Sequence, residues 1–315
     1  MTRKKLIRVI AGWIIAIIIF YILFRTIYVN REQLASWKWQ VSWPDAVVSC
    51  LLLFAAFGTA SLGWRSILIA FGHHIKFHEA FRVVYLANLG RYIPGKVWQV
   101  FGMVGLAKEV NIPPRVSLAS FALAEGYALP AAFLLIPILM GRSESLSTLI
   151  VYRDIMYLLI AIVLVVFLIL FFLPNGLNWA LNKVLRLFRQ EEVQYKPSMK
   201  NRIAIFMWYV VTWLLFGAAF HFFLTALIST TEFNILFSTG AYIAAYNLGY
   251  IAFLSPGGLG IREGVMSALL TPLLGAPIAA SIALISRVWI TIIEAVITLL
   301  ALLTYKLKPK KDGPS

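Results

Sequence analysis

Long apolar stretches, separated by short polar and basic segments, form the dominant pattern along this chain. A helix needs about 20 mostly apolar residues to cross the hydrocarbon core of a membrane. The first stretch follows a basic start, but no small-residue cleavage site comes after it, so we interpret it as an uncleaved span. The stretches cover residues 9–29, 46–64, 116–140, 155–173, 203–231, 233–261, 265–286 and 288–305. They predict an all-α integral membrane protein with one polytopic domain, residues 1–315.

Pro-Gly pairs interrupt the apolar pattern in residues 89–99 and in residues 254–264. Around the first pair, the apolar arms at 80–89 and 97–107 each reach only about half the bilayer thickness. Proline removes a backbone donor, and glycine accepts a non-helical turn. Unwound backbone is tolerated in a membrane only where protein buries it or water reaches it. Both segments are therefore predicted to be re-entrant hairpins beside a polar site.

The number of crossings depends on how the last third of the chain is interpreted. We favour six full spans plus two re-entrant hairpins, because residues 276–305 read as one long helix after Pro272, Gly275 and Pro277. The alternative has eight spans. In the favoured model the hairpins enter from opposite sides, as an inverted repeat requires. The two halves, residues 1–173 and 203–306, are joined by linker 174–202.

Basic residues are concentrated at the N-terminus, in the linker and in the C-terminal tail, which together hold half of the 28 lysines and arginines. Because basic loops stay on the cytoplasmic side, both termini and the linker are predicted to be cytoplasmic. Linker residues 177–188 form a basic amphipathic stretch, interpreted either as a helix on the inner leaflet or as a solvated loop helix.

Composition agrees with a membrane protein, since 61% of the residues are hydrophobic, 13% are charged and the mean hydropathy is +0.85. The net charge is +15, and the lysines and arginines lie between apolar stretches. The expected partners are therefore anionic lipid headgroups rather than nucleic acid. Cys50 is the single cysteine, and His73, His74 and His78 fit a headgroup patch better than a metal site. No nucleotide-binding loop occurs, and no metal or cofactor is predicted.

Lys96 and Arg262 stand next to the Pro-Gly interruptions. A helix beginning near either cation would present free backbone N–H groups and its positive dipole end, which together suit a phosphate. The candidate substrate-binding residues are Arg91, Lys96, Arg262, Glu263 and Glu125. For Arg91 alone, physical reasoning favours snorkelling to the interface.

Carboxylates at membrane depth are functional candidates by default, because they are costly to place in lipid. Glu125, Glu263 and Glu294 lie in or beside apolar stretches. The candidate basic partners are Arg65, Arg262 and Arg287. Arg287 and Glu294 are two turns apart on one helix face, which suits ion pairs with other helices or coupling to an ion. The alternative is that these residues form ion pairs that only lock helices together.

The segments Arg-Tyr-Ile-Pro-Gly-Lys-Val-Trp (91–98) and Ser-Pro-Gly-Gly-Leu-Gly-Ile-Arg-Glu-Gly (255–264) resemble signatures of the lysylphosphatidylglycerol synthase transmembrane-region family. The resemblance covers nearly the whole chain. It implies a flippase-like domain that moves polar or isoprenoid-linked lipids between leaflets in a bacterial or archaeal cell membrane. The positions that match are Arg91, Pro94, Gly95, Lys96, Pro256, Gly257, Gly258, Gly260, Arg262, Glu263 and Gly264.

The chain lacks the large soluble domain that follows the membrane part in the aminoacyl-lipid synthases of that family, so we expect a stand-alone member without synthase activity. The leading hypothesis is a translocase, passive or ion-coupled, that holds a lipid phosphate with Lys96 and Arg262. One alternative is a membrane enzyme acting on a lipid-linked phosphate, although acidic residues are few and no catalytic constellation is visible. Another is a non-transporting partner of a lipid-modifying enzyme.

Overall fold

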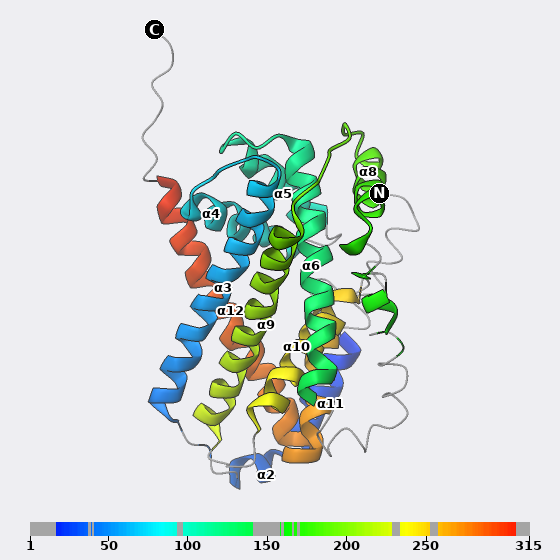
Figure 1. The fold of residues 1–315 in the computed structure, drawn as a ribbon. Helices are drawn as coiled ribbons and strands as arrows, with labels where there is room; N and C mark the ends of the chain where they lie inside the picture. The colour runs from blue at the N-terminus through cyan, green and yellow to red at the C-terminus, as the bar shows by residue number, and fades with distance from the viewer. Residues whose placement is uncertain are drawn as a thin grey trace.

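Helices account for all the regular secondary structure in the part of the chain that the structure describes (Figure 1). The computed structural model describes residues 17–36, 39, 41–92, 97–140, 158, 161–165, 167–168, 171–228, 234–252 and 258–306. The elements are α2 (Arg31–Ser36), α3 (Trp43–Ala70), α4 (Phe77–Asn88), η1 (Leu89–Tyr92), α5 (Val97–Lys108), α6 (Pro114–Met140), α8 (Pro174–Leu187), α9 (Met199–Leu227), α10 (Ile235–Ile251), α11 (Ile261–Leu274) and α12 (Ala276–Lys306).

Among the described residues, α3, α6, α9 and α12 are long and apolar enough to cross a membrane, and residues Ile17–Val29 form a shorter apolar helix. This confirms the prediction of an all-α membrane protein. As expected from the sequence, α12 is one continuous helix of 31 residues. The shorter helices α10 and α11 precede it as the arms of a hairpin, which favours the model with re-entrant segments.

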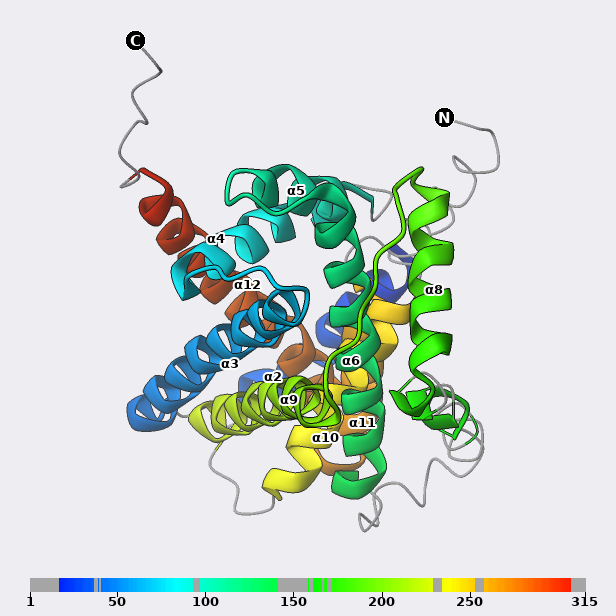
Figure 2. The ribbon, with the colours of Figure 1, turned by 45° about the horizontal axis from the view of Figure 1, so that its top comes forward.

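One arrangement of elements recurs in both halves of the chain, as a long helix, a hairpin of short helices and a second long helix. In the first half these are α3, α4 with α5, and α6, and in the second they are α9, α10 with α11, and α12. Figures 1 and 2 show α3 and α9 side by side and running in opposite directions. This inverted order is the one that the sequence predicted for a repeat.

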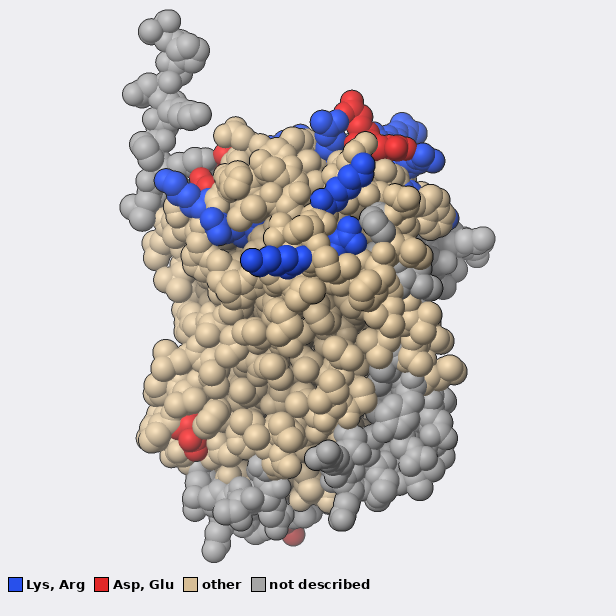
Figure 3. Space-filling view, in the orientation of Figure 1, with Lys and Arg blue, Asp and Glu red and all other residues tan. Residues whose placement is uncertain are grey.

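Lysines and arginines gather at one end of the molecule, above a broad band without charged side chains on the face shown in Figure 3. We call this the basic end. The C-terminal ends of α3 and α12, the N-terminal ends of α6 and α9, and α8 all lie there (Figure 1). The hairpin of α4 and α5 lies at the basic end, whereas that of α10 and α11 lies toward the opposite end. The exposed cations near this end are Lys76, Lys108, Lys183, Arg186, Arg189, Lys196 and Lys200.

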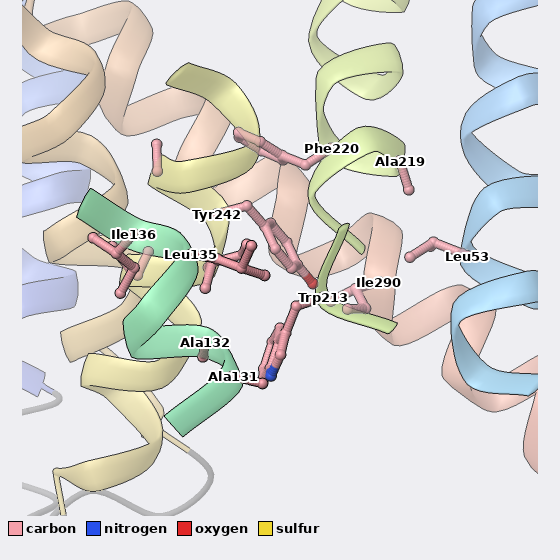
Figure 4. Close-up of a cluster of buried hydrophobic side chains, with 14 of the residues drawn as sticks. Leu53, Ala131, Ala132, Leu135, Ile136, Trp213, Ala219, Phe220, Tyr242 and Ile290 are labelled. Atoms are coloured by element: carbon pink, nitrogen blue, oxygen red, sulfur yellow. The ribbon is translucent and has the colours of Figure 1, made fainter. Parts of the chain in front are cut away.

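The core lies where α9 meets α3, α6 and α10. Ser49 of α3 donates a hydrogen bond to the carbonyl of Ala219 at 2.8 Å, which holds α3 against α9. Trp213 of α9 donates through its indole nitrogen to the carbonyl of Ala128 of α6, also at 2.8 Å. Figure 4 shows Tyr242 of α10 in the same cluster as Trp213 and Ala219 of α9, and the centroid of its ring lies 5.3 Å from that of Phe220.

The predicted amphipathic stretch of the linker is helical and corresponds to α8. Leu181 and Leu185 are buried, at 4% and 1% exposure, and α8 packs on α6. Part of the apolar face of this amphipathic helix therefore packs against protein. Trp179 and Leu187 remain exposed.

Candidate functional site

The tip of the first hairpin depends on Gly90, where the arms cross at very short range. A Cβ atom at Gly90 would lie 2.5 Å from the backbone nitrogen of Gln99, so only glycine fits this approach. A hydrogen bond of 2.6 Å from Gln99 Nε2 to Asn88 Oδ1 joins α5 to α4 at the same level. The Pro-Gly pair itself, Pro94 and Gly95, lies outside the described residues, as does Lys96.

Arg91, at this tip, forms an ion pair with Glu294 in the middle of α12. Glu294 is 12 residues from Lys306, or about 18 Å along the helix from the basic end. The expectation that Arg91 snorkels to the interface is therefore wrong. The sequence also missed this partner, because the two residues are far apart in the chain and nothing local links them.

The tip of the second hairpin shows a similar close approach through Gly249 and Gly258. Gly258 has a φ of +72°, and a Cβ there would lie 2.9 Å from the carbonyl oxygen of Gly249. A Cβ at Gly249 would lie 2.9 Å from the Cβ of Arg262, where α11 begins. In each hairpin, a glycine of the first arm thus lets the start of the second arm pack directly on it. Pro256 and Gly257 lie outside the described residues.

Arg262 is buried, with 5% of its surface exposed, and its guanidinium lies over two tyrosine rings of α10. The distances to the ring centroids of Tyr242 and Tyr246 are 5.1 and 5.0 Å. Its Nη2 donates to the hydroxyl of Tyr242 at 3.2 Å. Among the described residues, no carboxylate lies within ion-pair distance of Arg262. In the described structure, the charge is held by these aromatic faces and by the Tyr242 hydroxyl.

Glu263 caps the start of α11, since its Oε2 accepts a hydrogen bond of 2.7 Å from the backbone nitrogen of Gly260. Gly260 has a φ of +83°, which glycine adopts easily. The carboxylate is 1% exposed, and its Oε1 lies 3.7 Å from Arg287 Nη1 without a hydrogen-bond partner in the described structure. The N-terminus of α11 is thus already partly occupied by a carboxylate. One N–H group at this helix start is therefore taken, and the expectation that the start of α11 binds a phosphate stays a prediction.

Helix α12 connects the two hairpin tips, because Arg287 pairs with Glu263 of the second and Glu294 pairs with Arg91 of the first. Both α12 residues lie in the middle part of that helix, two turns apart. Glu294 also lies within electrostatic range of Arg262. The structure therefore brings Arg91, Arg262, Glu263, Arg287 and Glu294 to one polar centre at mid-depth.

Glu125 of α6 meets the second hairpin through its side-chain interaction with Tyr250 of α10. Tyr242, Tyr246 and Tyr250 are spaced four residues apart and so share one face of α10. Sequence reasoning missed these tyrosines, although that spacing is visible in the sequence. Gly264, by contrast, faces the N-terminal helix, where a Cβ would lie 3.4 Å from Ile19.

Within the described residues, no group of three or more His, Cys, Asp or Glu side chains could hold a metal ion. Of the other candidate partners for the carboxylates, Arg65 instead donates through Nε to the carbonyl of Ile75 at 2.7 Å. The site is thus built from paired arginines and glutamates with a tyrosine face.

The fold and this centre define an all-helical membrane protein with two opposed hairpins around a buried polar site. The family model described as the lysylphosphatidylglycerol synthase transmembrane region matches residues 8–298. The chain belongs to that family, as its two Pro-Gly segments indicated. A search of curated proteins finds no match.

Proposed function

We propose that this protein moves a lipid with an anionic headgroup, a phospholipid or an isoprenoid-linked phosphate, between the leaflets of a bacterial or archaeal cell membrane. The observation that carries the proposal is Arg262. It is a cation at membrane depth, at a hairpin tip, held by two tyrosine rings and without a carboxylate partner among the described residues. An intramembrane charge of this kind marks a substrate path by default.

The opposed hairpins supply the path for the headgroup in this proposal. Each tip reaches the middle of α12 from a different end, so a phosphate entering from either leaflet meets an arginine at similar depth. The acyl chains stay in the lipid beside the protein. Each arginine–glutamate pair can open in favour of a phosphate, because charge-assisted bonds to phosphate replace those to carboxylate.

The basic end is cytoplasmic in this proposal, because lysines and arginines concentrate on the cytoplasmic side of membrane proteins. Anionic lipids of that leaflet are attracted to the same surface. The proposed partners are therefore membrane lipids, and no covalent reaction is assigned to the chain.

Replacing Arg262 tests the proposal. We expect R262Q to lower the transbilayer exchange rate of fluorescent phosphatidylglycerol in proteoliposomes by about 10- to 100-fold, the value of a lost hydrogen bond to a charged group. R262K keeps the charge and is expected to retain part of the rate. Exchange is measured by quenching the outer-leaflet label, with phosphatidylcholine and a polyprenyl phosphate probe in parallel.

R65Q is the control, because Arg65 is a partly buried arginine of the membrane-spanning helix α3 and bonds to the carbonyl of Ile75 rather than to a residue of the polar centre. It is expected to leave exchange unchanged. Equal rates in R262Q and wild type would remove Arg262 from the path. No exchange of any probe by the wild-type protein would contradict translocation and favour a membrane enzyme or a partner of one.

A further inference from the structure

A half-open apolar pocket lies between α6, α8 and the described residues just before α8, away from the hairpin tips. Its walls include Gly126 and Tyr127 of α6, Phe167 and Phe171, and Leu177 and Leu181 of α8. Its cavity volume is about 160 Å³, which is smaller than the roughly 300–1,000 Å³ typical of sites for whole small molecules and suits a segment of one hydrocarbon chain. None of the residues of the polar centre lines it.

The surroundings of the pocket resemble a lipid-facing surface. Phe172, Leu173 and Trp179, which are close in sequence to its walls, are 58%, 55% and 66% exposed. The wall on α6 belongs to a helix long and apolar enough to span the membrane. A hydrocarbon chain is the ligand that such a lining would bind from a bilayer.

A buried arginine lies behind the wall of the pocket and bonds to a wall residue. Arg202 of α9 is 6% exposed, and its Nη1 donates to the carbonyl of the wall residue Phe171 at 2.7 Å. Its Nε is buried and has no hydrogen-bond partner in the described structure. The hydroxyl of Tyr127 lies 3.2 Å from that of Tyr195, and both rings are within electrostatic range of Arg202. Because an unsatisfied buried donor is costly, an acceptor beyond those of the described residues would stabilise this position.

We propose that this pocket binds one acyl chain of an anionic phospholipid, whose phosphate or ester oxygens accept a hydrogen bond from Arg202. The bound lipid is a resident one that stays outside the translocation path. It connects the linker helix α8 to α6 and to the start of α9, and so joins the two halves of the molecule. Anionic lipid is selected because Lys183, Lys196 and Lys200 are exposed on the linker and at the start of α9.

The test fills the pocket without disturbing the helix. A Cβ at Gly126 would meet no atom within 4 Å, so G126L extends into open space. G105L is the matched control, because Gly105 of α5 is also helical with nothing within 4 Å and does not line the pocket. The full-length protein is reconstituted with phosphatidylglycerol carrying a photoreactive acyl chain, and cross-linked peptides are mapped by mass spectrometry.

We expect cross-links in α6 and α8 for wild type and G105L, and a fall of about tenfold in G126L, because the leucine displaces about two methylene groups of the chain. R202Q is expected to lower labelling by phosphatidylglycerol and by phosphatidylcholine alike, because both carry the phosphate and ester oxygens that Arg202 bonds, and to leave the preference for phosphatidylglycerol in place. Exchange of the fluorescent lipid through the polar centre continues in G126L, which separates this site from the translocation path.

Equal labelling of α6 and α8 in G126L and G105L would overturn the proposal. Equal labelling by both headgroups in the wild type would overturn the selection of anionic lipid, and unchanged labelling in R202Q would overturn the role of Arg202. Cross-links between two copies of the chain through this pocket would show that a second copy, and not a lipid, occupies it.

Discussion

Reversing the charge at Arg91 or at Glu294 alone is expected to destabilise the protein and stop exchange, and reversing both is expected to restore much of each. The pair joins the tip of the first hairpin to α12, and the two side chains are only 22% and 13% exposed. A like-charged pair at this depth repels and leaves both groups without partners. In the cycle of R91E, E294R and the double variant, we expect a coupling energy of about 2 kcal/mol. Thermal unfolding of the purified protein in detergent measures it.

The pair between Arg186 and Glu192 is the matched control, because it has the same chemistry on the surface, with side chains 73% and 57% exposed. Solvent screens such pairs, so the same swap there is expected to change stability by about 0.5 kcal/mol or less. A coupling energy at Arg91 and Glu294 no larger than in this control would show that the pair does not hold the hairpin. A double variant with restored stability but no exchange would instead place one of the two charges in direct contact with the lipid.

The hairpins could be predicted from sequence because their signals are local. A Pro-Gly pair inside an apolar stretch identifies the interruption, and the length of each apolar arm gives its depth. The continuity of α12 was also predictable, since no interruption follows Pro277. These features depend on neighbouring residues and on the thickness of a membrane, and both can be read without a structure.

The composition of the polar centre could not be predicted in the same way. Arg91 and Glu294 are separated by most of the chain, and only the packing of α12 on α4 brings them together. Three arginines were weighed as partners for the carboxylates, and of these Arg287 pairs with Glu263. The cap that Glu263 makes on α11 was readable from its place three residues after Gly260, the spacing at which an acid reaches back to the helix start.

The tyrosines of α10 could have been predicted as one face of a helix from the sequence, although we did not single them out. Their four-residue spacing predicts one shared face, yet aromatic residues are common in membrane proteins, so the spacing alone did not single them out. Arg262 explains the role of that face, because the rings of Tyr242 and Tyr246 stabilise its guanidinium.

Because of the close contact at Gly90, we expect G90A to lower both the stability of the protein and the rate of lipid exchange. In G90A, the new Cβ would lie 2.5 Å from a backbone nitrogen of α5, so the arms must separate by about 1 Å, and overpacking of this kind costs about 1–3 kcal/mol. The tip then moves away from α12, and a displacement of 1 Å at a binding group lowers a rate by about a hundredfold. Leaflet exchange and thermal unfolding measure the two effects.

Two further variants serve as comparisons for G90A, namely G249A in the second hairpin and G105A in α5. At Gly249 the nearest atom to an added Cβ is the side-chain Cβ of Arg262 at 2.9 Å, so G249A is expected to have the same sign and a smaller effect. G105A adds a Cβ where nothing lies within 4 Å and is expected to leave stability and exchange unchanged. If all three variants behaved alike, the glycines would act through general helix flexibility. An order of G90A, G249A and G105A from largest to smallest effect would instead show that the close crossing of the hairpin arms positions Arg91 and Arg262.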